Sequence, residues 1–343
     1  MTGPPRSRTI PAVPDLRESG SEELVLAFLA EAGDEFVSGE VISDKLGLSR
    51  AAVWKHVEAL RGHGYRIDAA PARGYRLREI PDRLTALELR PLLGTHDLGQ
   101  VLHCFGEVAS TNDLAKQLAE EGAGHGEVVI AECQTAGRGR RGRGWVSPPG
   151  RNVTFSAVLR PELPPQRAPE LTLVAAVALC HAVRRAGVDA GIKWPNDLVA
   201  GGRKLCGILT ELAADPDQVQ WVVLGAGINV NATAADFPEE LRGSATSMAL
   251  ERGQPVPRAL FAAAALTLLE EWLDRHAEGG FAAVRDEWRA LSDTLGRVVR
   301  VQADGRDLEG LAEDLDETGA LLVRAGGRLE RVLSGDVQHL RAR

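Results

Sequence analysis

The 343-residue sequence contains no apolar run long enough to cross a membrane, and its first 20 residues lack the apolar stretch of a secretory signal. Its four cysteines stand far apart and form no C-x-x-C pair, so neither a structural zinc site nor a disulfide framework is expected. These absences favour a cytoplasmic protein with reduced thiols and no membrane partner. We expect residues 1–20, rich in Pro, Arg and Ser, to form a flexible tail.

The sequence also lacks an overall positive charge, since 48 Asp and Glu outnumber 40 Lys and Arg, for a formal net charge of −8. A protein of this charge would on the whole repel nucleic acid. The charge is unevenly distributed, however. Between Ser38 and Arg78 there are eight Lys or Arg and four Asp or Glu, an excess of +4 (8 − 4). This segment could therefore meet nucleic acid although the remaining chain is acidic.

The pattern of that basic segment predicts a winged helix-turn-helix over residues 21–80. Helices are expected at 21–32 and 39–46, each with apolar residues on a helical repeat, followed by a third helix. Tyr65–Ile67 and Gly74–Leu77 would form the two strands of a basic wing. The alternative is a small helical packing domain without a nucleic-acid partner.

The third helix would be the one that enters a major groove. Ser49 is its expected N-cap, and Val53, Val57 and Leu60 repeat at helical spacing. The residues off this apolar stripe are the candidate DNA-binding residues Ser49, Arg50, Trp54 and Lys55.

A G-x-x-x-x-G-K-[ST] phosphate loop is absent too, and Gly225-Ala226-Gly227 is only a fragment of a dinucleotide fingerprint. A nucleotide would have to be held by another device. Residues 137–145, GRGRRGRGW, place four arginines and four glycines between expected strands at 128–131 and 152–159. Glycines let a main chain approach a ligand closely, and guanidinium groups match carboxylate or phosphate oxygens. We interpret the stretch as an anion-binding loop; the alternative is a solvated or nucleic-acid-binding Arg/Gly tract.

Four further motifs accompany this loop in a fixed order. They are Ser110-Thr111-Asn112, Lys193-Trp194-Pro195-Asn196-Asp197, Arg203 to Leu209 (RKLCGIL) and Gly225 to Asn231 (GAGINVN). In order and spacing the set resembles the biotin protein ligases. Ser49-Arg50-Ala51-Ala52 and Gly74-Tyr75 resemble the subgroup of that family that carries a winged domain and represses its own biotin genes. Gly144 departs from the family pattern, in which a lysine commonly precedes the tryptophan.

The expected fold class is α+β. An N-terminal winged helix-turn-helix at residues 21–80 would precede a central mixed α/β ligase domain at 84–291, which the resemblance makes class II synthetase-like. A small C-terminal β-barrel is expected at 295–343, from two apolar runs separated by glycine turns. In the central segment we expect helices at 114–121, 169–186, 258–278 and 281–291, and strands near 128, 153, 191, 205 and 221.

The resemblance implies an ATP-dependent, AMP-forming ligase. It would form biotinyl-5'-AMP and transfer biotin to a lysine of the biotin carboxyl carrier protein of acetyl-CoA carboxylase. It would also bind operator DNA as a homodimer and repress biotin genes in response to biotin. Joining a carboxylate to ATP brings two anions together, which requires fixed cations. Mg²⁺ is expected as the partner of ATP rather than at a protein metal site.

The resemblance also assigns the site residues. The catalytic residues would be Lys204, Arg140 and Lys193. The biotin-binding residues would be Ser110, Thr111, Asn112, Gln134, Arg138, Gly139, Arg140 and Lys204. The ATP-binding residues would be Arg138, Arg140, Arg143, Trp145, Lys193, Asn196 beside Asp197, and Asn229.

Taken singly, these residues have simpler interpretations: Ser110 could be a helix N-cap, Trp145 a core aromatic and Lys204 a solvated lysine. Two other functions stay open, a transcription regulator that binds biotin or a similar acid without turnover, and a lipoate or related acyl ligase. The cation set favours catalysis over sensing. By family pattern, the Arg/Gly loop followed by Trp145 favours biotin over lipoate.

Overall fold

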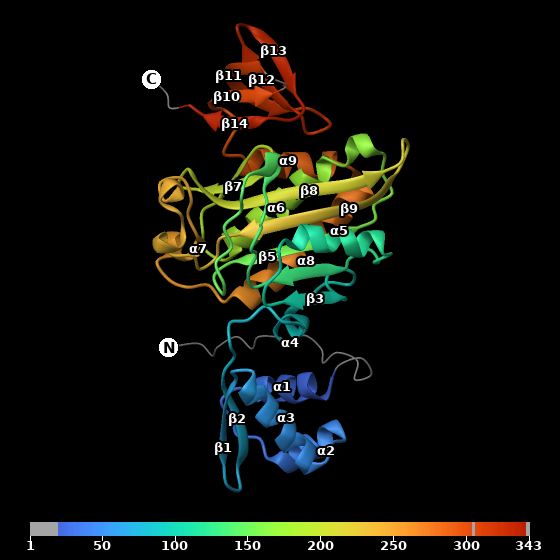
Figure 1. Ribbon diagram of the computed structural model, residues 1–343, viewed down its shortest axis with the longest axis vertical. Helices are drawn as coiled ribbons and strands as arrows, with labels where there is room; N and C mark the ends of the chain where they lie inside the picture. Colours follow the sequence, from blue (N-terminus) through green and yellow to red (C-terminus); the bar gives the residue numbers. More distant parts are fainter. Residues whose placement is uncertain (1–19, 304–305, 341–343) are drawn as a thin grey trace, which may run out of the picture. The chain divides into compact units, whose positions relative to one another are not determined.

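The computed structural model describes residues 20–303 and 306–340, so all but Gly20 of the tail expected at 1–20 lies outside the described residues. The chain divides after Asp82 into two compact units (Figure 1). The first unit contains three helices and a hairpin. They are α1 (Ser21–Glu31), α2 (Gly39–Leu46), α3 (Arg50–Gly62), β1 (Arg66–Ala70) and β2 (Gly74–Glu79), and the two strands pair antiparallel. This is the predicted winged helix-turn-helix arrangement.

Short polar residues and a glycine set the boundaries of α2 and α3. The Ser38 hydroxyl accepts a hydrogen bond from the Val41 N–H at 3.2 Å and so caps α2, which ends at Gly47 in the left-handed conformation (φ 64). Ser49 caps α3 in the same way, accepting from the Ala52 N–H at 3.1 Å. Such caps satisfy backbone donors that a helix start leaves unpaired. They turn the chain sharply between the two helices.

Gly74 allows the wing hairpin, β1 and β2, to lie against the backbone of Val37, just before α2. Val37 and Tyr75 exchange two backbone hydrogen bonds of 2.8 Å, which brings the start of β2 onto Val37. Gly74 has φ +99, and a Cβ there would lie 2.0 Å from the Val37 carbonyl oxygen. Only glycine can occupy this position without displacing backbone.

We therefore predict that Gly74→Ala destabilises the first unit by roughly 1–3 kcal/mol, because it combines a positive φ with a backbone clash. Hydrogen exchange of the α1–α3 amides would measure the loss. Gly62→Ala is the matched control, since a Cβ at Gly62 meets nothing within 4 Å. Equal protection of the amides in Gly74→Ala and Gly62→Ala would contradict this account of the wing.

Seven strands of the second unit form one mixed sheet in the order β3-β4-β5-β9-β8-β7-β6. Only β3 and β4 are parallel neighbours. The strands are β3 (Leu102–Phe105), β4 (Val128–Ala131), β5 (Val153–Leu159), β6 (Gly191–Lys193), β7 (Asp197–Ala200), β8 (Arg203–Ala214) and β9 (Val219–Ile228). The sequence predicted β4, β5, β6, β8 and β9 and missed β3 and β7.

Helices cover this sheet on both faces. The helices of the second unit are α4 (Ala86–Leu89), α5 (Thr111–Glu120), α6 (Glu170–Arg185), α7 (Met248–Arg252), α8 (Arg258–Gly279) and α9 (Ala282–Leu291). Short 3-10 turns lie at Arg90–Leu92, Arg140–Gly142, Pro165–Arg167, Ala234–Asp236 and Glu239–Leu241. Figure 1 shows α5 on one side of the sheet and α6 on the other. No helix in the described ranges combines the length and apolar character that a membrane span requires.

Side chains alternate along each strand, so the two faces of the central sheet pack against different elements. Leu224 of β9 belongs to the main core, which includes the buried sides of α6 and α8. Val223, one residue earlier, packs on the opposite face with Ala115 of α5. Because side chains alternate along a strand, Gly225 and Gly227 lie on the face of α5. They leave that face open beside the helix.

The C-terminal segment forms a separate five-stranded antiparallel sheet within the second unit. Its strands are β10 (Val298–Ala303), β11 (Arg306–Leu315), β12 (Leu321–Ala325), β13 (Arg328–Val332) and β14 (Asp336–His339), in the order β13-β12-β11-β10-β14. The edge strands β13 and β14 do not pair with each other, so the predicted β-barrel is not confirmed: the described residues form no closed barrel.

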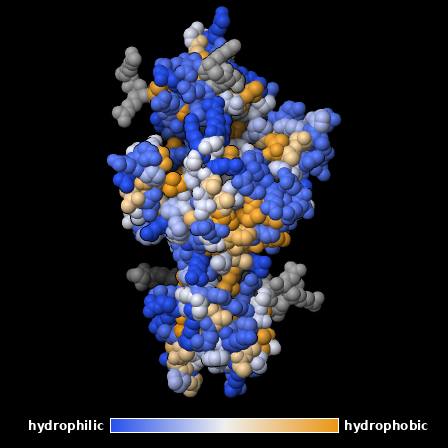
Figure 2. Space-filling view, in the orientation of Figure 1, coloured by the Kyte–Doolittle hydropathy of each residue, from blue (hydrophilic) through white to orange (hydrophobic). Residues whose placement is uncertain are grey.

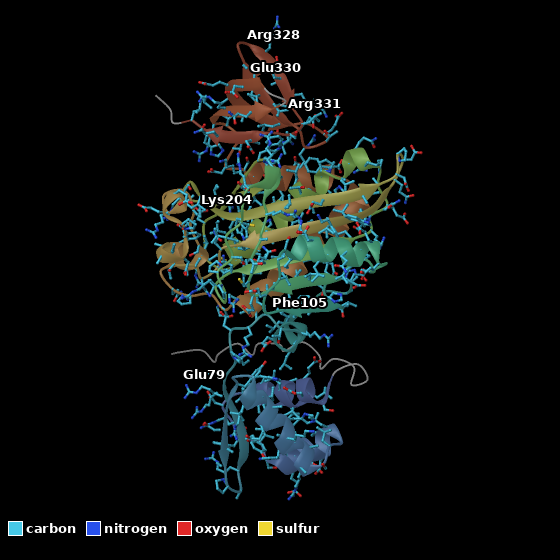
Figure 3. All side chains as sticks on the ribbon, viewed as in Figure 1. Glu79, Phe105, Lys204, Arg328, Glu330 and Arg331 are labelled. Atoms are coloured by element: carbon cyan, nitrogen blue, oxygen red, sulfur yellow. The ribbon has the colours of Figure 1, made fainter. Side chains whose placement is uncertain are left out.

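The outer edge of this sheet is polar, which explains why it can stay open. Arg328, Glu330 and Arg331 are exposed on β13 (Figure 3), and Figure 2 shows a mainly hydrophilic surface over this part of the molecule. Charged side chains on an edge strand oppose pairing with another strand.

Candidate functional site

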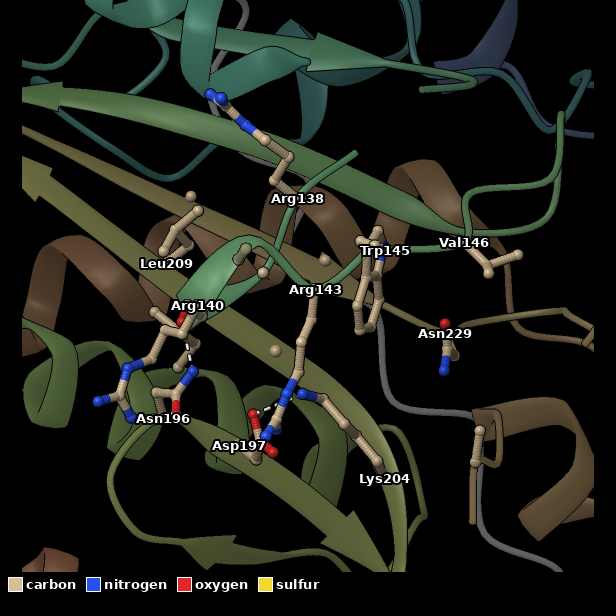
Figure 4. A pocket seen from close by; sticks show the side chains of 18 of the residues that line it. Arg138, Arg140, Arg143, Trp145, Val146, Asn196, Asp197, Lys204, Leu209 and Asn229 are labelled. Carbon is tan, nitrogen blue, oxygen red and sulfur yellow. Dashed lines mark hydrogen bonds and ion pairs between the residues drawn. The ribbon is translucent and has the colours of Figure 1, made fainter. Parts of the chain in front are cut away.

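A cavity of about 640 Å³ lies on the open face of the central sheet, between the start of α5, the Arg/Gly loop, and strands β8 and β9 (Figure 4). The structure brings every predicted biotin- or ATP-binding residue to its lining. These are Ser110, Thr111, Asn112, Gln134, Arg138, Gly139, Arg140, Arg143, Trp145, Lys193, Asn196, Asp197, Lys204 and Asn229. Residues separated by more than a hundred positions in sequence thus share one cavity.

The Arg/Gly loop is a short hairpin over the cavity. The Trp145 N–H donates to the Gly137 carbonyl at 2.8 Å, and the Gly139 N–H donates to the Arg143 carbonyl at 2.7 Å. At its tip, Arg141 has φ 56 and Gly142 has φ 73, both left-handed. The left-handed arginine was not foreseen, since glycine was expected to supply such conformations.

The tip of the loop is bound to the C-terminal sheet through Asp336. Arg143 contacts the Asp336 carboxylate at 2.5 Å and Arg141 contacts it at 3.3 Å. Arg140 donates to the Gly335 carbonyl at 3.3 Å and to Asn196 Oδ1 at 3.2 Å. Asp336 also lines the cavity. Sequence reasoning missed it, because an isolated Asp beside a glycine turn carries no signal of a partner some 190 residues earlier.

Two lysines, Lys193 and Lys204, also line the cavity. Lys204 Nζ lies 2.8 Å from Asp197 Oδ1 (Figure 4) and 5.8 Å from the centre of a Trp145 ring. Burial lowers the pKa of Lys193, and the nearby Asp197 only partly offsets this effect. Burial likewise lowers the pKa of Arg140. The cations around the cavity are therefore partly desolvated or paired with carboxylates, which prepares them for an anionic ligand.

Trp145 closes one side of the cavity by packing on two glycines. A Cβ on Gly227 would lie 2.5 Å from the indole, and one on Gly207 would lie 3.3 Å from it. Gly207 and Gly227 are paired across β8 and β9. The indole Nε1 of Trp145 is buried and has no hydrogen-bond partner among the described residues. Trp145 is thus a cavity wall with a free donor rather than a member of the main core.

The start of α5 contributes buried polar groups. The Ser110 hydroxyl caps the helix, accepting from the Asp113 N–H at 3.4 Å. Thr111 donates its backbone N–H to Gln134 Oε1 at 2.7 Å. The predicted helix at 114–121 therefore begins three residues earlier than expected, which puts Thr111 and Asn112 in its first turn. The simpler interpretation of Ser110 as an N-cap is correct, and Ser110 also lines the cavity.

Two predicted ligand residues are already bonded within the chain. Asn229 Nδ2 donates to the Thr246 carbonyl at 3.0 Å, and its Oδ1 accepts from Asn152 at 3.1 Å. The Arg138 guanidinium pairs with Asp113 of α5 and points away from Lys204 in Figure 4. Asn229 thus helps to shape the cavity, and the guanidinium of Arg138 is engaged by Asp113.

Among the described residues, no histidine lines this cavity. His103 contacts Glu127 at 2.9 Å, and His181 contacts Glu287 at 2.9 Å, both away from the cavity lining. In the described residues no group of three or more His, Cys, Asp or Glu is arranged to hold a metal ion.

The candidate DNA-binding residues lie on the first unit. Arg50, Trp54 and Lys55 are exposed along α3, and the Trp54 side chain is 58% exposed. Arg50 pairs with Glu40 of α2 at 2.7 Å. Ser49 acts as the cap of α3, so its hydroxyl is engaged by the helix itself.

Comparison with known proteins identifies the family. The sequence matches the "Biotin/lipoate A/B protein ligase family" over residues 105–229, an "HTH domain" over 22–76 and the "Biotin protein ligase C terminal domain" over 294–340. It is 39% identical to the bifunctional ligase/repressor BirA of Bacillus subtilis over 324 residues, which cover 94% of this chain and 99% of that protein. The chain belongs to the biotin protein ligase family. As a member, it is an enzyme, a ligase with an N-terminal helix-turn-helix domain.

Other relatives agree with this membership. The bifunctional ligase/repressor BirA of Escherichia coli is 34% identical over 308 residues, covering 89% of this chain and 94% of that protein. The solved biotin protein ligase from Aquifex aeolicus, in complex with biotin and ATP, superposes with a TM-score of 0.62 at 28% identity. That match covers 71% of this chain and all of the Aquifex chain.

The packing of Trp145 yields a prediction about this ligase. Gly227→Ala should displace the indole, because a Cβ there would overlap it. The Trp145 indole N–H resonance should move and exchange faster with solvent, while the other five tryptophan resonances stay within about a line width. Trp145→Phe identifies the resonance, and Gly106→Ala is the control, since a Cβ at Gly106 meets nothing within 4 Å. An unmoved Trp145 resonance would refute the proposed packing.

Proposed function

We propose that this chain activates biotin with ATP as biotinyl-5'-AMP and transfers it to a lysine of a biotin carboxyl carrier protein. The observation that carries the proposal is the gathering of Arg140, Arg143, Lys193 and Lys204 around one cavity that also has buried polar groups at the start of α5. The Aquifex relative's complex with biotin and ATP supports the choice of ligands.

In the first step a carboxylate oxygen of biotin attacks the α-phosphorus of ATP, and the bond to pyrophosphate breaks. Lys204 would lie near the carboxylate of biotin. Its ammonium group would leave Asp197 and pair with this carboxylate instead. Lys193, Asn196 and the guanidinium groups of the loop would face the phosphates. Fixed cations in a partly desolvated site stabilise the charge that develops on the phosphoryl oxygens.

In the second step the neutral amine of the carrier lysine attacks the acyl carbon, loses a proton and releases AMP. The amine must be neutral because an ammonium group has no lone pair to donate.

Mg²⁺ would arrive with the triphosphate and neutralise part of its charge. Two carboxylates, Asp197 and Asp336, line the cavity, and each pairs with a cation of the chain. Because too few carboxylates converge for a metal site of the protein's own, this donor set fits a magnesium ion held mainly by phosphate oxygens. A cytoplasmic location is part of the same proposal, and four free cysteines among the described residues support it.

The test is incubation with biotin and labelled ATP. We expect pyrophosphate release, and then biotin on one lysine of an added carrier domain. Lys204→Ala should slow adenylation roughly 10²-fold, since it removes a cation from the reacting oxygens, and it should change stability by less than about 1 kcal/mol. Lys45→Ala is the control on an exposed helix. Biotin binding without pyrophosphate release would assign the chain to ligand sensing without turnover.

We further propose that the Arg/Gly hairpin retains the adenylate. Arg140 spans from the hairpin to Asn196 and Gly335, so it links three parts of the cavity rim. Closure over a mixed anhydride excludes water that would hydrolyse it. A guanidinium fork suits this bridging role, because it can donate to several acceptors at once.

Arg140→Gly should therefore still form the adenylate but release it about tenfold faster or more, because its charge-assisted bonds are lost. Labelling of lysines on a bystander protein would report the escaping intermediate, and rapid filtration would give the release rate. Arg151→Gly, an arginine outside the hairpin, should behave like the parent protein. Parent-like retention in Arg140→Gly would assign the loop arginines to ATP binding alone.

We propose that the first unit binds operator DNA and that the protein represses biotin genes as a homodimer. Exposed Arg50, Trp54 and Lys55 on α3 support the DNA contact, and the repressor function in the relatives' names supports the regulation. Ligand-ordered loops could couple biotinyl adenylate to dimer formation, since a ligand that favours one state stabilises it.

Removing residues 1–82 should leave ligation within about threefold of the parent, because the compact second unit contains the whole cavity. It should abolish sequence-specific DNA binding. Gel shifts with an inverted-repeat operator, with and without biotin and ATP, and sedimentation of the full chain test the coupling. Equal affinity and equal mass in both conditions would exclude it.

A further inference from the structure

A file of hydrogen-bonded polar groups runs from the partly exposed Glu211 to the buried Thr111, which lines the cavity. Asn112 Nδ2 donates to Glu211 Oε2 at 2.8 Å and to the Leu209 carbonyl at 3.2 Å. Both partners are acceptors, so the nitrogen of this amide must face β8. Its oxygen, Oδ1, therefore faces Ser156 on β5, whose hydroxyl oxygen lies 2.6 Å away.

The orientation of Asn112 then decides where the hydroxyl protons go. Ser156 Oγ lies 2.6 Å from Asn112 Oδ1 and 2.8 Å from Thr111 Oγ1, but it has one proton. Asn112 Oδ1 has no proton to offer, so the Ser156 proton must point to it. The Thr111 hydroxyl proton is left to serve either Ser156 Oγ at 2.8 Å or Gln134 Oε1 at 3.0 Å.

In either case the Thr111 hydroxyl donates its proton to a group of the protein, not to a ligand. Thr111 Oγ1 can then offer a ligand only lone pairs. Gln134 Oε1 is an acceptor as well, and it already accepts the Thr111 N–H. The floor of the cavity at Thr111 is thus built to receive a hydrogen bond and cannot donate one from this hydroxyl.

Burial and packing hold the file in this arrangement. Ser156 is 0% exposed, Thr111 is 2% exposed and Asn112 is 6% exposed, so the groups are shielded from water that could substitute for a lost partner. A Cβ on Gly225 would lie 1.8 Å from Asn112 Oδ1, so the amide fills the space that this glycine leaves. At the outer end, Lys116 contacts Glu211 at 2.8 Å.

Glu211 is a suitable anchor for the file because it stays ionised. Burial opposes its charge, but the hydrogen bonds from Lys116 and Asn112 prevail and hold the pKa of Glu211 below its ordinary value. An ionised carboxylate can only accept hydrogen bonds, so it cannot turn Asn112 around. Without it, the Leu209 carbonyl at 3.2 Å would be the remaining restraint on the amide nitrogen.

We infer that Glu211 is a positioning residue that acts through Asn112 and Ser156 to make Thr111 a hydrogen-bond acceptor, and thereby selects a ligand with an N–H donor at the cavity floor. This inference rests on the proposed function. The ureido ring of biotin carries two N–H groups, whereas the dithiolane ring of a lipoyl group carries none. An acceptor at Thr111 therefore favours biotin over lipoate, a discrimination that removal of Glu211 should weaken.

The test combines variants of the full-length protein with altered ligands, measured by titration calorimetry. The ligands are biotin and two analogues of the same shape, in which one or the other ureido N–H is replaced by CH₂. The parent protein should bind one analogue at least about tenfold more weakly than biotin, because an acceptor left without its donor loses a hydrogen bond. Glu211→Ala should weaken biotin binding by a similar factor and weaken that analogue by less than about twofold.

Matched variants separate positioning from general damage. Glu211→Gln keeps an acceptor for Asn112 and should stay within about threefold of the parent for biotin. Lys116→Ala removes the other partner of Glu211 and should change biotin affinity by less than about twofold. Asn112→Ala removes the acceptor of the Ser156 proton, which can then point to Thr111, so this variant should reproduce Glu211→Ala and provides a second test if Glu211→Ala folds poorly.

The outcomes are distinguishable. Equal weakening of biotin and both analogues by Glu211→Ala would make Glu211 merely structural and overturn the inference. Equal affinity of the parent for biotin and both analogues would overturn it as well, while leaving biotin as the ligand. If the parent bound no biotin at all, the proposed function itself would fail, and this inference with it.

Discussion

The cavity depends on the pairing of its cations with carboxylates of the same chain. Arg141 and Arg143 share Asp336, Lys204 has Asp197, and Arg138 has Asp113. So many positive groups around one cavity would repel one another without these partners. The pairs are partly exposed, and exposed ion pairs contribute only about 0–1 kcal/mol each. A ligand with several negative oxygens can therefore replace the carboxylates at small cost, which is a suitable starting state for binding two anions.

The alternation of the central sheet makes room for that exchange. One face of β8 and β9 contributes to the main core with α6 and α8, and the other presents Gly207, Gly225 and Gly227 to the cavity. Trp145 and the Asn112 amide lie directly against these glycines. The flat indole and the buried amide thus occupy space that any larger side chain would take. Lys193 and Lys204 lie on β6 and β8, and rigid strands favour a fixed geometry for the cations at the cavity.

Local patterns in the sequence predicted much of this architecture. The helix caps Ser38 and Ser49, the glycine after α2 and the apolar repeats of α6 and α8 have short-range causes, so the expected helices lie near their observed bounds. The short helices α4 and α7 were not expected. The ligand residues were predicted from the resemblance of the motifs to a known family. In the structure all of them line one cavity. Their individual roles are still predictions.

Contacts between residues far apart in the chain were not predicted from the sequence. Asp336 contacts the Arg/Gly hairpin only because the C-terminal sheet folds against it. Glu211 contacts Asn112 only because the fold brings β8 to the start of α5. The expected barrel was not confirmed, for a related reason. Apolar runs indicated strands correctly, but closure depends on whether the two edge strands meet, and the short, charged β13 stays at an open edge. The left-handed Arg141 is likewise set by the hairpin and by its contact with Asp336, not by its own preference.

The most direct test of the central claim is the fate of the carboxylate oxygens of biotin. Biotin labelled with ¹⁸O in both carboxylate oxygens would be turned over with ATP and a carrier domain, and the AMP analysed by ³¹P NMR. Attack on the α-phosphorus predicts one ¹⁸O atom in each AMP released as biotin passes to the lysine. AMP free of ¹⁸O, in a reaction that still biotinylates the carrier, would contradict an acyl adenylate formed in this cavity.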